Sequence, residues 1–251
     1  EWTYTVDNDK VQYLSAGEEK KETFTVQSID GTTKDIVITI TGTNDVPTIG
    51  GDSTGAVTED ASTHYLTDSG TLSISDDDTG EDTFQTDPST ITASAGALGS
   101  LTITEAGAWT YTVANSAVQY LKADETKVET FTVKSADGTA EQTITITITG
   151  TNDVPEISGV ASGAVTEDAS THYLTDSGTL SISDDDTGED TFQTDPSTIT
   201  ASAGALGSLT ITEAGAWTYT VANSAVQYLK AGETKVETFT VKSADGTAEE
   251  T

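Results

Sequence analysis

The sequence predicts an all-β protein built from tandem β-sandwich repeats, and two observations predict it. Residues 55–141 recur at 163–249 with one difference, Asp124 against Gly232, so 86 of 87 positions match at a spacing of 108 residues. Within each copy apolar residues alternate with threonine, and the segment 143–149 reads TITITIT. Alternation of period two is typical of half-buried strands, and a period near 108 fits a self-contained domain rather than a solenoid unit.

Seven strands are predicted in the copy at 47–154. They lie near 56–58, at 71–75, near 83–85, and at 100–104, 109–113, 129–134 and 143–149. Clusters of Asp, Ser, Glu and Gly predict turns at 68–70, 78–80, 105–107 and 137–138. The helix-like stretch at 116–121 is one or two turns at most. Seven short strands in a domain of this size are typical of an immunoglobulin-like or cadherin-like seven-stranded sandwich, here repeated in a linear array.

The spacing also predicts the domain boundaries. Residues 1–46 form the C-terminal half of one repeat, 47–154 a complete repeat, and 155–251 a repeat that lacks its last strand. The missing strand is expected to leave an open edge and an uncovered apolar stripe. We favour a window on a longer continuous chain over the alternative, in which residues 35–41 of a neighbouring molecule supply the strand.

Composition excludes several classes of function. The chain has 42 acidic and 10 basic residues, a net charge of −32, and such a surface repels nucleic acid and anionic lipid. The absence of cysteine excludes disulfides, thiolate zinc sites and thiol catalysis. No stretch approaches the ~20 apolar residues of a membrane-spanning helix. We therefore expect no membrane insertion and, from the negative charge, no nucleic-acid partner. An apolar content of 34% and regular alternation favour folded domains over the disorder that high acidity can cause.

Acidic and amide side chains gather in the predicted loops, and their clustering predicts a metal site. The linker at 44–45, the loop at 76–82 and the turn at 137 should converge at one pole of the sandwich, and residues 59–60 should face the opposite pole and the next linker. Carboxylates packed this closely need a counter-ion. The predicted ligands are Asn44, Asp45, Glu59, Asp60, Asp76, Asp77, Asp78, Asp82 and Asp137 in one copy, and Asn152, Asp153, Glu167, Asp168, Asp184, Asp185, Asp186, Asp190 and Asp245 in the next.

Calcium is the predicted ion, because it takes 6–8 oxygen ligands at about 2.3–2.6 Å, whereas magnesium prefers a rigid octahedron. Zinc is disfavoured because the clusters hold no His or Cys. The alternative interpretation is that these are solvated turn residues, since Asp and Gly favour turns in any case. Three consecutive acids at 76–78 exceed what a turn needs.

Nothing in the chain predicts catalysis. A near-perfect tandem array gives identical sites in series, which an enzyme does not need but a spacer or multivalent binder uses. His64 and His172 occur once per repeat without a second His as a ligand partner, and Trp109 and Trp217 have the inward register of a strand. The adjacent acids Glu59 and Asp60 point to opposite faces of a strand, which defeats the geometry of a glycosidase carboxylate pair.

A set of motifs together resembles the VCBS repeat. They are the ending GTNDVP at 150–155, the opening GAVTED at 55–60, the loop SDDD at 75–78, the strand GAWTYTV at 107–113 and the turn SADG at 135–138. That family consists of cadherin-like and immunoglobulin-like modules of large bacterial secreted adhesins, often with RTX-type C-termini. The resemblance covers the whole chain.

The resemblance implies type I export, calcium-dependent rigidity between modules, and a role in attachment or biofilm matrix. By similarity to cadherins, it gives residues 44–45 the part of the interdomain calcium linker, Asp76 and Asp78 that of the Asp-x-Asp motif, Asp137 that of the following loop ligand and Glu59 that of the first-strand glutamate. The linker has fewer acids than the cadherin pattern, which leaves the number of ions per junction open.

The sequence therefore predicts a calcium-stiffened, extracellular and non-enzymatic spacer of a bacterial surface adhesin or matrix protein. Its expected partners are the neighbouring repeats of the same chain, joined through calcium junctions, and other copies of itself. Two alternatives remain: the subunit of a self-assembling extracellular filament or sheath, and a carbohydrate-binding module, for which an exposed aromatic patch would be decisive.

Overall fold

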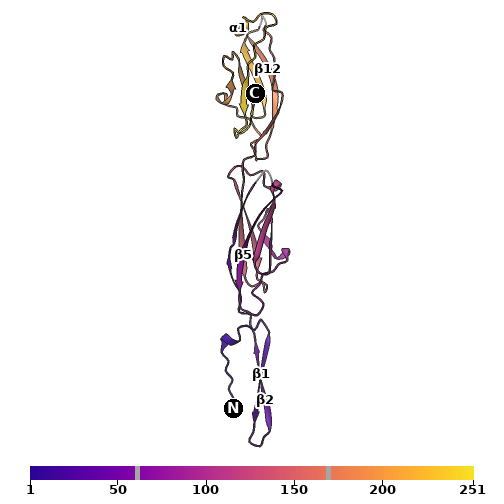
Figure 1. Ribbon diagram of the computed structural model, residues 1–251, viewed down its shortest axis with the longest axis vertical. Helices are drawn as coiled ribbons and strands as arrows, with labels where there is room; N and C mark the ends of the chain where they lie inside the picture. The colour runs from indigo at the N-terminus through magenta and orange to yellow at the C-terminus, as the bar shows by residue number, and fades with distance from the viewer. Residues whose placement is uncertain (60–62, 168–170) are drawn as a thin grey trace. The chain divides into compact units, whose positions relative to one another are not determined.

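The computed structural model describes residues 1–59, 63–167 and 171–251, and it confirms the all-β tandem sandwich (Figure 1). The chain forms two compact units. The first unit holds residues 1–117 and 126–149, and the second holds 118–125 and 150–251.

The first unit contains ten strands and three one-turn 3₁₀ helices among its described residues. The strands are β1 (Glu19–Gln27), β2 (Thr33–Thr41), β3 (Thr48–Gly51), β4 (Thr54–Thr58), β5 (Tyr65–Ser75), β6 (Thr92–Ala93), β7 (Ser100–Ile103), β8 (Ala108–Ala114), β9 (Thr126–Lys134) and β10 (Glu141–Thr149). The helices are η1 (Asn8–Lys10), η2 (Pro88–Thr90) and η3 (Asn115–Ala117).

Two four-stranded sheets make the sandwich of this unit. One sheet has the order β3-β5-β8-β7 and the other β4-β10-β9-β6. The strand pairs are antiparallel except β4 and β10, which run parallel with Thr54 opposite Thr145 and Thr58 opposite Thr149. The strand predicted near 83–85 is reduced to one bridge between Phe84 and Ser135, and the short strand β6 was not predicted.

The chain enters the sandwich by crossing from one sheet to the other. Strand β3 pairs with β5, but β4, three residues later, pairs with β10. Gly51 lies at the crossing with a φ of 93°, in the left-handed region that favours glycine. A Cβ at this position would lie 2.6 Å from the carbonyl oxygen of Thr71, so the crossing needs a residue without a side chain.

The turn predicted at 68–70 is wrong, because these residues lie inside β5. Gly70 pairs with Trp109 across the β5–β8 ladder. A Cβ on Gly70 would lie 2.4 Å from Cζ2 of the Trp109 indole, so the glycine here makes room for a ring rather than a turn. The indole N–H donates to the carbonyl oxygen of Asp52 at 2.8 Å, and the Trp109 side chain is buried.

The inward faces of both sheets form the core. Ile144, Ile146 and Ile148 of β10 are fully buried, as the alternation with threonine predicts. Tyr111 of β8 packs against Phe131 of β9 with ring centroids 5.7 Å apart, which joins the two sheets.

A carboxylate lies in this core. The side chain of Glu129 is fully buried and accepts hydrogen bonds from the backbone N–H of Leu98 at 2.6 Å and of Gly99 at 3.1 Å. It also accepts from the Tyr111 hydroxyl at 2.9 Å. Three donors satisfy the buried charge and fix the loop before β7 to strand β9.

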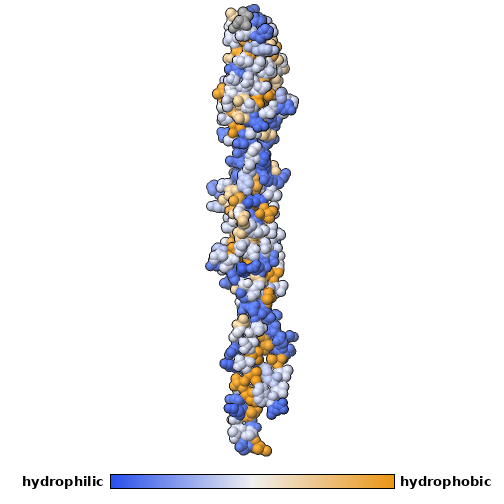
Figure 2. Space-filling view, turned by 180° about the vertical axis from the view of Figure 1, so that it is seen from behind, coloured by the Kyte–Doolittle hydropathy of each residue, from blue (hydrophilic) through white to orange (hydrophobic). Residues whose placement is uncertain are grey.

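The N-terminal segment of the first unit contributes the antiparallel hairpin β1–β2. Apolar side chains lie at the surface of this hairpin (Figure 2). Phe24 and Val26 are each 47% exposed, whereas their sequence equivalents Phe131 and Val133 are buried in the core of the sandwich.

The second unit repeats the first four-stranded sheet, but its other sheet has three shorter strands and, among the described residues, no counterpart of β4. Its strands are β11 (Glu156–Gly159), β12 (Tyr173–Ser183), β13 (Thr200–Ala201), β14 (Ser208–Ile211), β15 (Ala216–Ala222), β16 (Phe239–Lys242) and β17 (Glu249–Glu250). Its helices are η4 (Pro196–Thr198) and α1 (Asn223–Val226). The sheets have the orders β11-β12-β15-β14 and β13-β16-β17. A cavity of about 530 Å³ opens beside the apolar side chains of Leu174, Trp217 and Val241.

No helix in the described ranges has the length and apolar character needed to cross a membrane.

We expect Gly70→Ala to destabilise the first sandwich, because the added methyl overlaps the Trp109 indole. Overpacking of this kind costs about 1–3 kcal/mol, and thermal unfolding should show it as a lower melting temperature. Ser69→Ala, at the exposed neighbouring position on the same strand, is the control and should change little. Equal effects of the two substitutions would contradict the packing of Gly70 against Trp109.

Tyr111→Phe removes one of the three donors to the buried Glu129 carboxylate. Loss of a hydrogen bond to a buried charge costs about 1–3 kcal/mol, and chemical denaturation should measure it. Tyr65→Phe is the matched control, since the Tyr65 side chain is 64% exposed. A Tyr111 variant as stable as the Tyr65 variant would show that the hydroxyl adds nothing to the core.

Candidate metal centre

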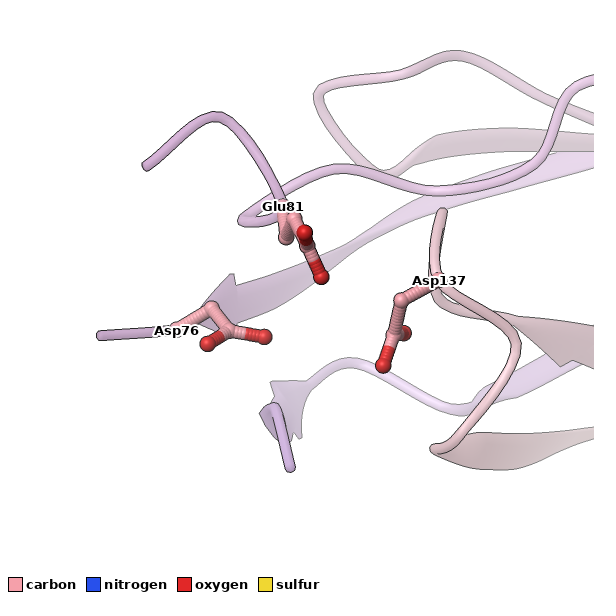
Figure 3. A group of neighbouring side chains, drawn as sticks. All are labelled: Asp76, Glu81 and Asp137. Atoms are coloured by element: carbon pink, nitrogen blue, oxygen red, sulfur yellow. The ribbon is translucent and has the colours of Figure 1, made fainter. Parts of the chain in front are cut away.

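Three carboxylates of the first unit meet at one end of its sandwich, and each comes from a different chain segment. Asp76 follows directly after β5, Asp137 lies in the turn between β9 and β10, and Glu81 follows the turn at Gly80. Gly80 has a φ of 82°, which lets the loop reverse before Glu81. The three side chains point toward one another (Figure 3).

The distances within this group are short. One carboxylate oxygen from each of Asp76, Glu81 and Asp137 lies within 4.8 Å of the others, and all three residues are partly buried. We call this group the first acidic cluster. The second unit holds the same arrangement in Asp184, Glu189 and Asp245, which we call the second acidic cluster.

Local hydrogen bonds hold the cluster residues in place. The backbone N–H of Asp78 donates to Oδ1 of Asp76 at 2.9 Å, which is a turn closed by an Asp side chain. The hydroxyl of Ser135 donates to Oδ1 of Asp137 at 2.5 Å, and that of Thr139 donates to its Oδ2. The second cluster has the same bonds, with Asp186 N–H to Asp184 Oδ1 at 2.9 Å.

The linker before each sandwich is attached to its cluster by two hydrogen bonds. In the first unit Asn44 Nδ2 donates to Asp137 Oδ2 at 3.1 Å, and the backbone N–H of Asp45 donates to Asp78 Oδ2 at 2.7 Å. In the second unit the corresponding bonds from Asn152 and Asp153 measure 3.2 and 2.9 Å. The structure thus brings together the linker, the acidic loop and the turn in both units.

The carboxylates of these sites differ in their electrostatics. Burial and the neighbouring charges of Asp78, Asp77 and Asp76 raise the pKa of Asp45. Burial, followed by the charges of Asp245, Glu189 and Asp185, raises the pKa of Asp184 above its ordinary value, although the Asp186 N–H opposes the shift.

Asp137 and Asp245 shift the other way. Burial acts to raise the pKa of Asp137, but hydrogen bonds from Ser135, Thr139 and Asn44 outweigh it and hold that pKa at about 2. The same kinds of bonds lower the pKa of Asp245. These two residues stay ionised, whereas Asp45 and Asp184 are ionised against the cost of burial and like charge.

Three carboxylate oxygens, two in the first acidic cluster and one on the neighbouring Asp78, are buried without a hydrogen-bond partner. They are Oδ2 of Asp76, Oδ1 of Asp78 and Oε2 of Glu81. The Asp78 side chain is only 1% exposed. In the second cluster Oδ2 of Asp184 and Oε2 of Glu189 are in the same state. Because a buried, unpaired carboxylate oxygen is costly, this donor set of oxygens alone fits a hard divalent cation such as calcium.

The structure places the other predicted residues outside these groups. Asp77, Asp82, Asp185 and Asp190 are exposed. Glu59 is buried, with its backbone N–H donating to the Thr149 carbonyl at 2.8 Å, and Glu167 accepts from Gln227 Nε2 at 2.5 Å. Asp60 and Asp168 lie outside the described residues.

Glu81 and Glu189, the third member of each cluster, were not among the predicted ligands. The adjacent acids, Asp82 and Asp190, were predicted instead. Two neighbouring acids after a glycine give no sequence signal for which one turns inward, because the left-handed Gly80 breaks the alternation that would assign their sides.

One family model matches the chain. The model, described as a bacterial cadherin-like domain, matches residues 44–150 and again residues 152–251. No curated protein matches the chain.

Among solved structures, the chain is similar to the protocadherin gamma B4 extracellular domain at 14% identity, covering 87% of this chain and 33% of that one, with a TM-score of 0.37. It is also similar to mouse clustered PcdhgC3, EC1-3, at 15% identity, covering 95% of this chain and 74% of that one, with a TM-score of 0.33. A third similarity is to domains 4-9 of the surface layer protein SbsC, at 16% identity, with 94% and 39% covered and a TM-score of 0.27. The chain spans a third of the length of the protocadherin gamma B4 chain and half of that of PcdhgB3 EC1-4, which it also matches.

Proposed function

Since the chain belongs to the bacterial cadherin-like domain family, we propose that it is a calcium-binding spacer of an extracellular bacterial adhesin or matrix protein, of the VCBS type. Membership in the family supports an extracellular repeat with a role in adhesion. The finer proposal adds that calcium at the acidic clusters stiffens the array of repeats. The repeats proposed to form it are residues 1–46, 47–154 and 155–251.

The buried, unpartnered oxygens of Asp76, Asp78 and Glu81 carry this proposal. Calcium, when bound, would supply the positive charge and the oxygen coordination that these groups lack. The proposed ligands in the first unit are Asp76, Asp78, Glu81 and Asp137, with Asn44 and Asp45 from the linker. The equivalents in the second unit are Asp184, Asp186, Glu189, Asp245, Asn152 and Asp153.

These residues can convert ion binding into stiffness because they come from both the linker and the sandwich. Asn44 and Asp45 already contact Asp137 and Asp78 through hydrogen bonds. Shared coordination would hold the linker against the loop more tightly than these two bonds alone. Without a counter-ion, repulsion among the carboxylates opposes that closure.

The conditions outside cells suit such a site. Extracellular calcium modules bind with affinities of roughly 10⁻⁴–10⁻³ M. The chain would therefore be loaded outside the cell and empty inside it, where unpaired carboxylates favour an open state.

We expect the double variant Asp76→Asn with Asp184→Asn to be at least as stable as the parent chain without calcium and less stable than the parent with calcium. With a chelator it should be at least as stable as the parent chain, because two repelling charges are gone while an amide oxygen can still accept the backbone bond. With calcium the parent should gain about 1.4 kcal/mol per site at ten-fold saturation, and the variant should lose most of that gain. Thermal unfolding with and without calcium measures both states.

Glu105→Gln with Glu213→Gln is the matched control, since it removes the same charge at two exposed turn positions. This control should keep the full response to calcium. If the melting temperature of the parent chain does not respond to calcium, the proposal is wrong.

Electron microscopy of the chain with and without chelator tests the stiffening directly. We expect a narrow range of angles between the repeats in millimolar calcium and a wide range without it. Equal ranges would contradict the spacer function. Regular polymers in calcium would favour the filament alternative instead.

A further inference from the structure

One lysine contacts the second acidic cluster. Nζ of Lys122 lies 3.3 Å from Oε1 of Glu189, and the two side chains are 41% and 15% exposed. Lys122 and Glu189 belong to the same compact unit. The carboxylate of Glu189 is thus shared between the cluster and a positive charge on the chain itself.

The first acidic cluster has a serine in the equivalent place. The segment Val11-Gln12-Tyr13-Leu14 recurs as Val118-Gln119-Tyr120-Leu121, and the next residue is Ser15 in the first copy and Lys122 in the second.

Backbone contacts show that the two positions are equivalent in space. The Tyr13 carbonyl accepts from Thr79 N–H at 3.2 Å, and the Tyr120 carbonyl accepts from Thr187 N–H at 3.2 Å. The backbone N–H of Ser15 donates to Glu18 Oε2, and that of Lys122 to Glu125 Oε2, both at 3.3 Å. The same loop therefore has a serine beside one acidic loop and a lysine beside the other.

The rest of the two sites is matched. The carboxylates are identical in type and number, and the linker bonds differ by at most 0.2 Å between the units. Between residues 7–18 and 114–125 the loops differ further at four positions, where Asp7, Asp9, Lys10 and Gly17 correspond to Ala114, Ser116, Ala117 and Asp124. Each set of four carries a net charge of −1, so the exchange of Ser15 for Lys122 is the change that alters the net charge of the loop.

We infer that Lys122 is a tethered cation that weakens divalent-ion binding at the second acidic cluster, so that the two clusters fill at different calcium concentrations. The inference rests on the proposed function. An ammonium within reach of Glu189 neutralises part of the field that attracts the ion and competes for one of its oxygens. The first cluster, with Ser15, has no such competitor at this position.

The two junctions of the chain would then respond to different calcium concentrations. As calcium rises, the junction at the first cluster would close before the junction at the second. Lys122 would also lessen the repulsion among Asp184, Glu189 and Asp245 in the empty state, so the second cluster would depend less on the ion for its stability.

Calcium titration by calorimetry of the full chain tests the inference. In a chain with Asp76→Asn and Asp137→Asn, which disable the first cluster, we expect Lys122→Ser to lower the calcium Kd of the second cluster by about threefold to thirtyfold. Lys122→Gln, which keeps the length of the side chain without its charge, should give the same direction. The effect should shrink in high salt, because Lys122 is partly exposed.

Lys134→Ser is the control, since it removes one positive charge from a different ion pair, that with Glu141 at 2.7 Å. It should leave the Kd unchanged. In the mirror experiment, Asp184→Asn and Asp245→Asn disable the second cluster, and Ser15→Lys should weaken binding at the first.

The outcomes separate the two proposals. If the parent chain takes up no calcium, the proposed function fails. If calcium binds but Lys122→Ser and Lys122→Gln leave the Kd unchanged, the role of Lys122 is overturned while the calcium site stands. A shift equal to that of Lys134→Ser would likewise overturn it, because it would reflect net charge alone.

Discussion

The mutual repulsion of carboxylates gathered at one end of each sandwich is the constraint on which the rest of the structure depends. Asp76, Glu81 and Asp137 come from three segments, and the fold of the sandwich together with local hydrogen bonds to Asp76 and Asp137 keeps one oxygen of each within 4.8 Å of the others. The apolar core supplies the free energy that holds those strand ends together. Ile144, Ile146 and Ile148 on one sheet and Trp109 on the other therefore support the site from the core.

The carboxylates of the cluster differ in how far hydrogen bonds satisfy them. Asp137 has four hydrogen bonds from Ser135, Thr139 and Asn44 and so keeps its charge at little cost. Asp76 and Glu81 are left with oxygens that nothing in the described structure satisfies. If hydrogen bonds satisfied all three carboxylates, as they do Asp137, no oxygen would be left over for a cation. If all three were unsatisfied, their repulsion would separate them.

Sequence reasoning succeeds here where a pattern repeats along a strand. The alternation of Ile and Thr at 143–149 assigned the buried face of β10 correctly, and the fold class followed from seven such segments. It fails where a residue acts through its shape. Gly70 was predicted as a turn because glycine is common in turns, but it lies inside β5 because a Trp109 ring needs its space. Strand β3 was missed because nothing in a short run of Thr, Ile and Gly distinguishes a strand from a linker.

The site, too, could be predicted only in part from the sequence. The convergence of linker, loop and turn followed from the order of strands in a sandwich. The choice between Glu81 and Asp82 depended on a left-handed glycine whose effect on side-chain direction only the coordinates show. The contrast between Ser15 and Lys122 was visible in the sequence, but it gained meaning only when the structure placed Lys122 beside Glu189.

The parallel pairing of β4 with β10 has a mechanical consequence. β4 follows the short first strand β3 of the sandwich, β10 is its last strand, and the two run in the same direction. A pull on the two ends of the repeat draws β4 backward and β10 forward, so the strands must slide past each other. The evenly spaced hydrogen bonds of a parallel pair then bear the load together rather than opening one after another. Under tension along the chain, this pair is therefore loaded in shear.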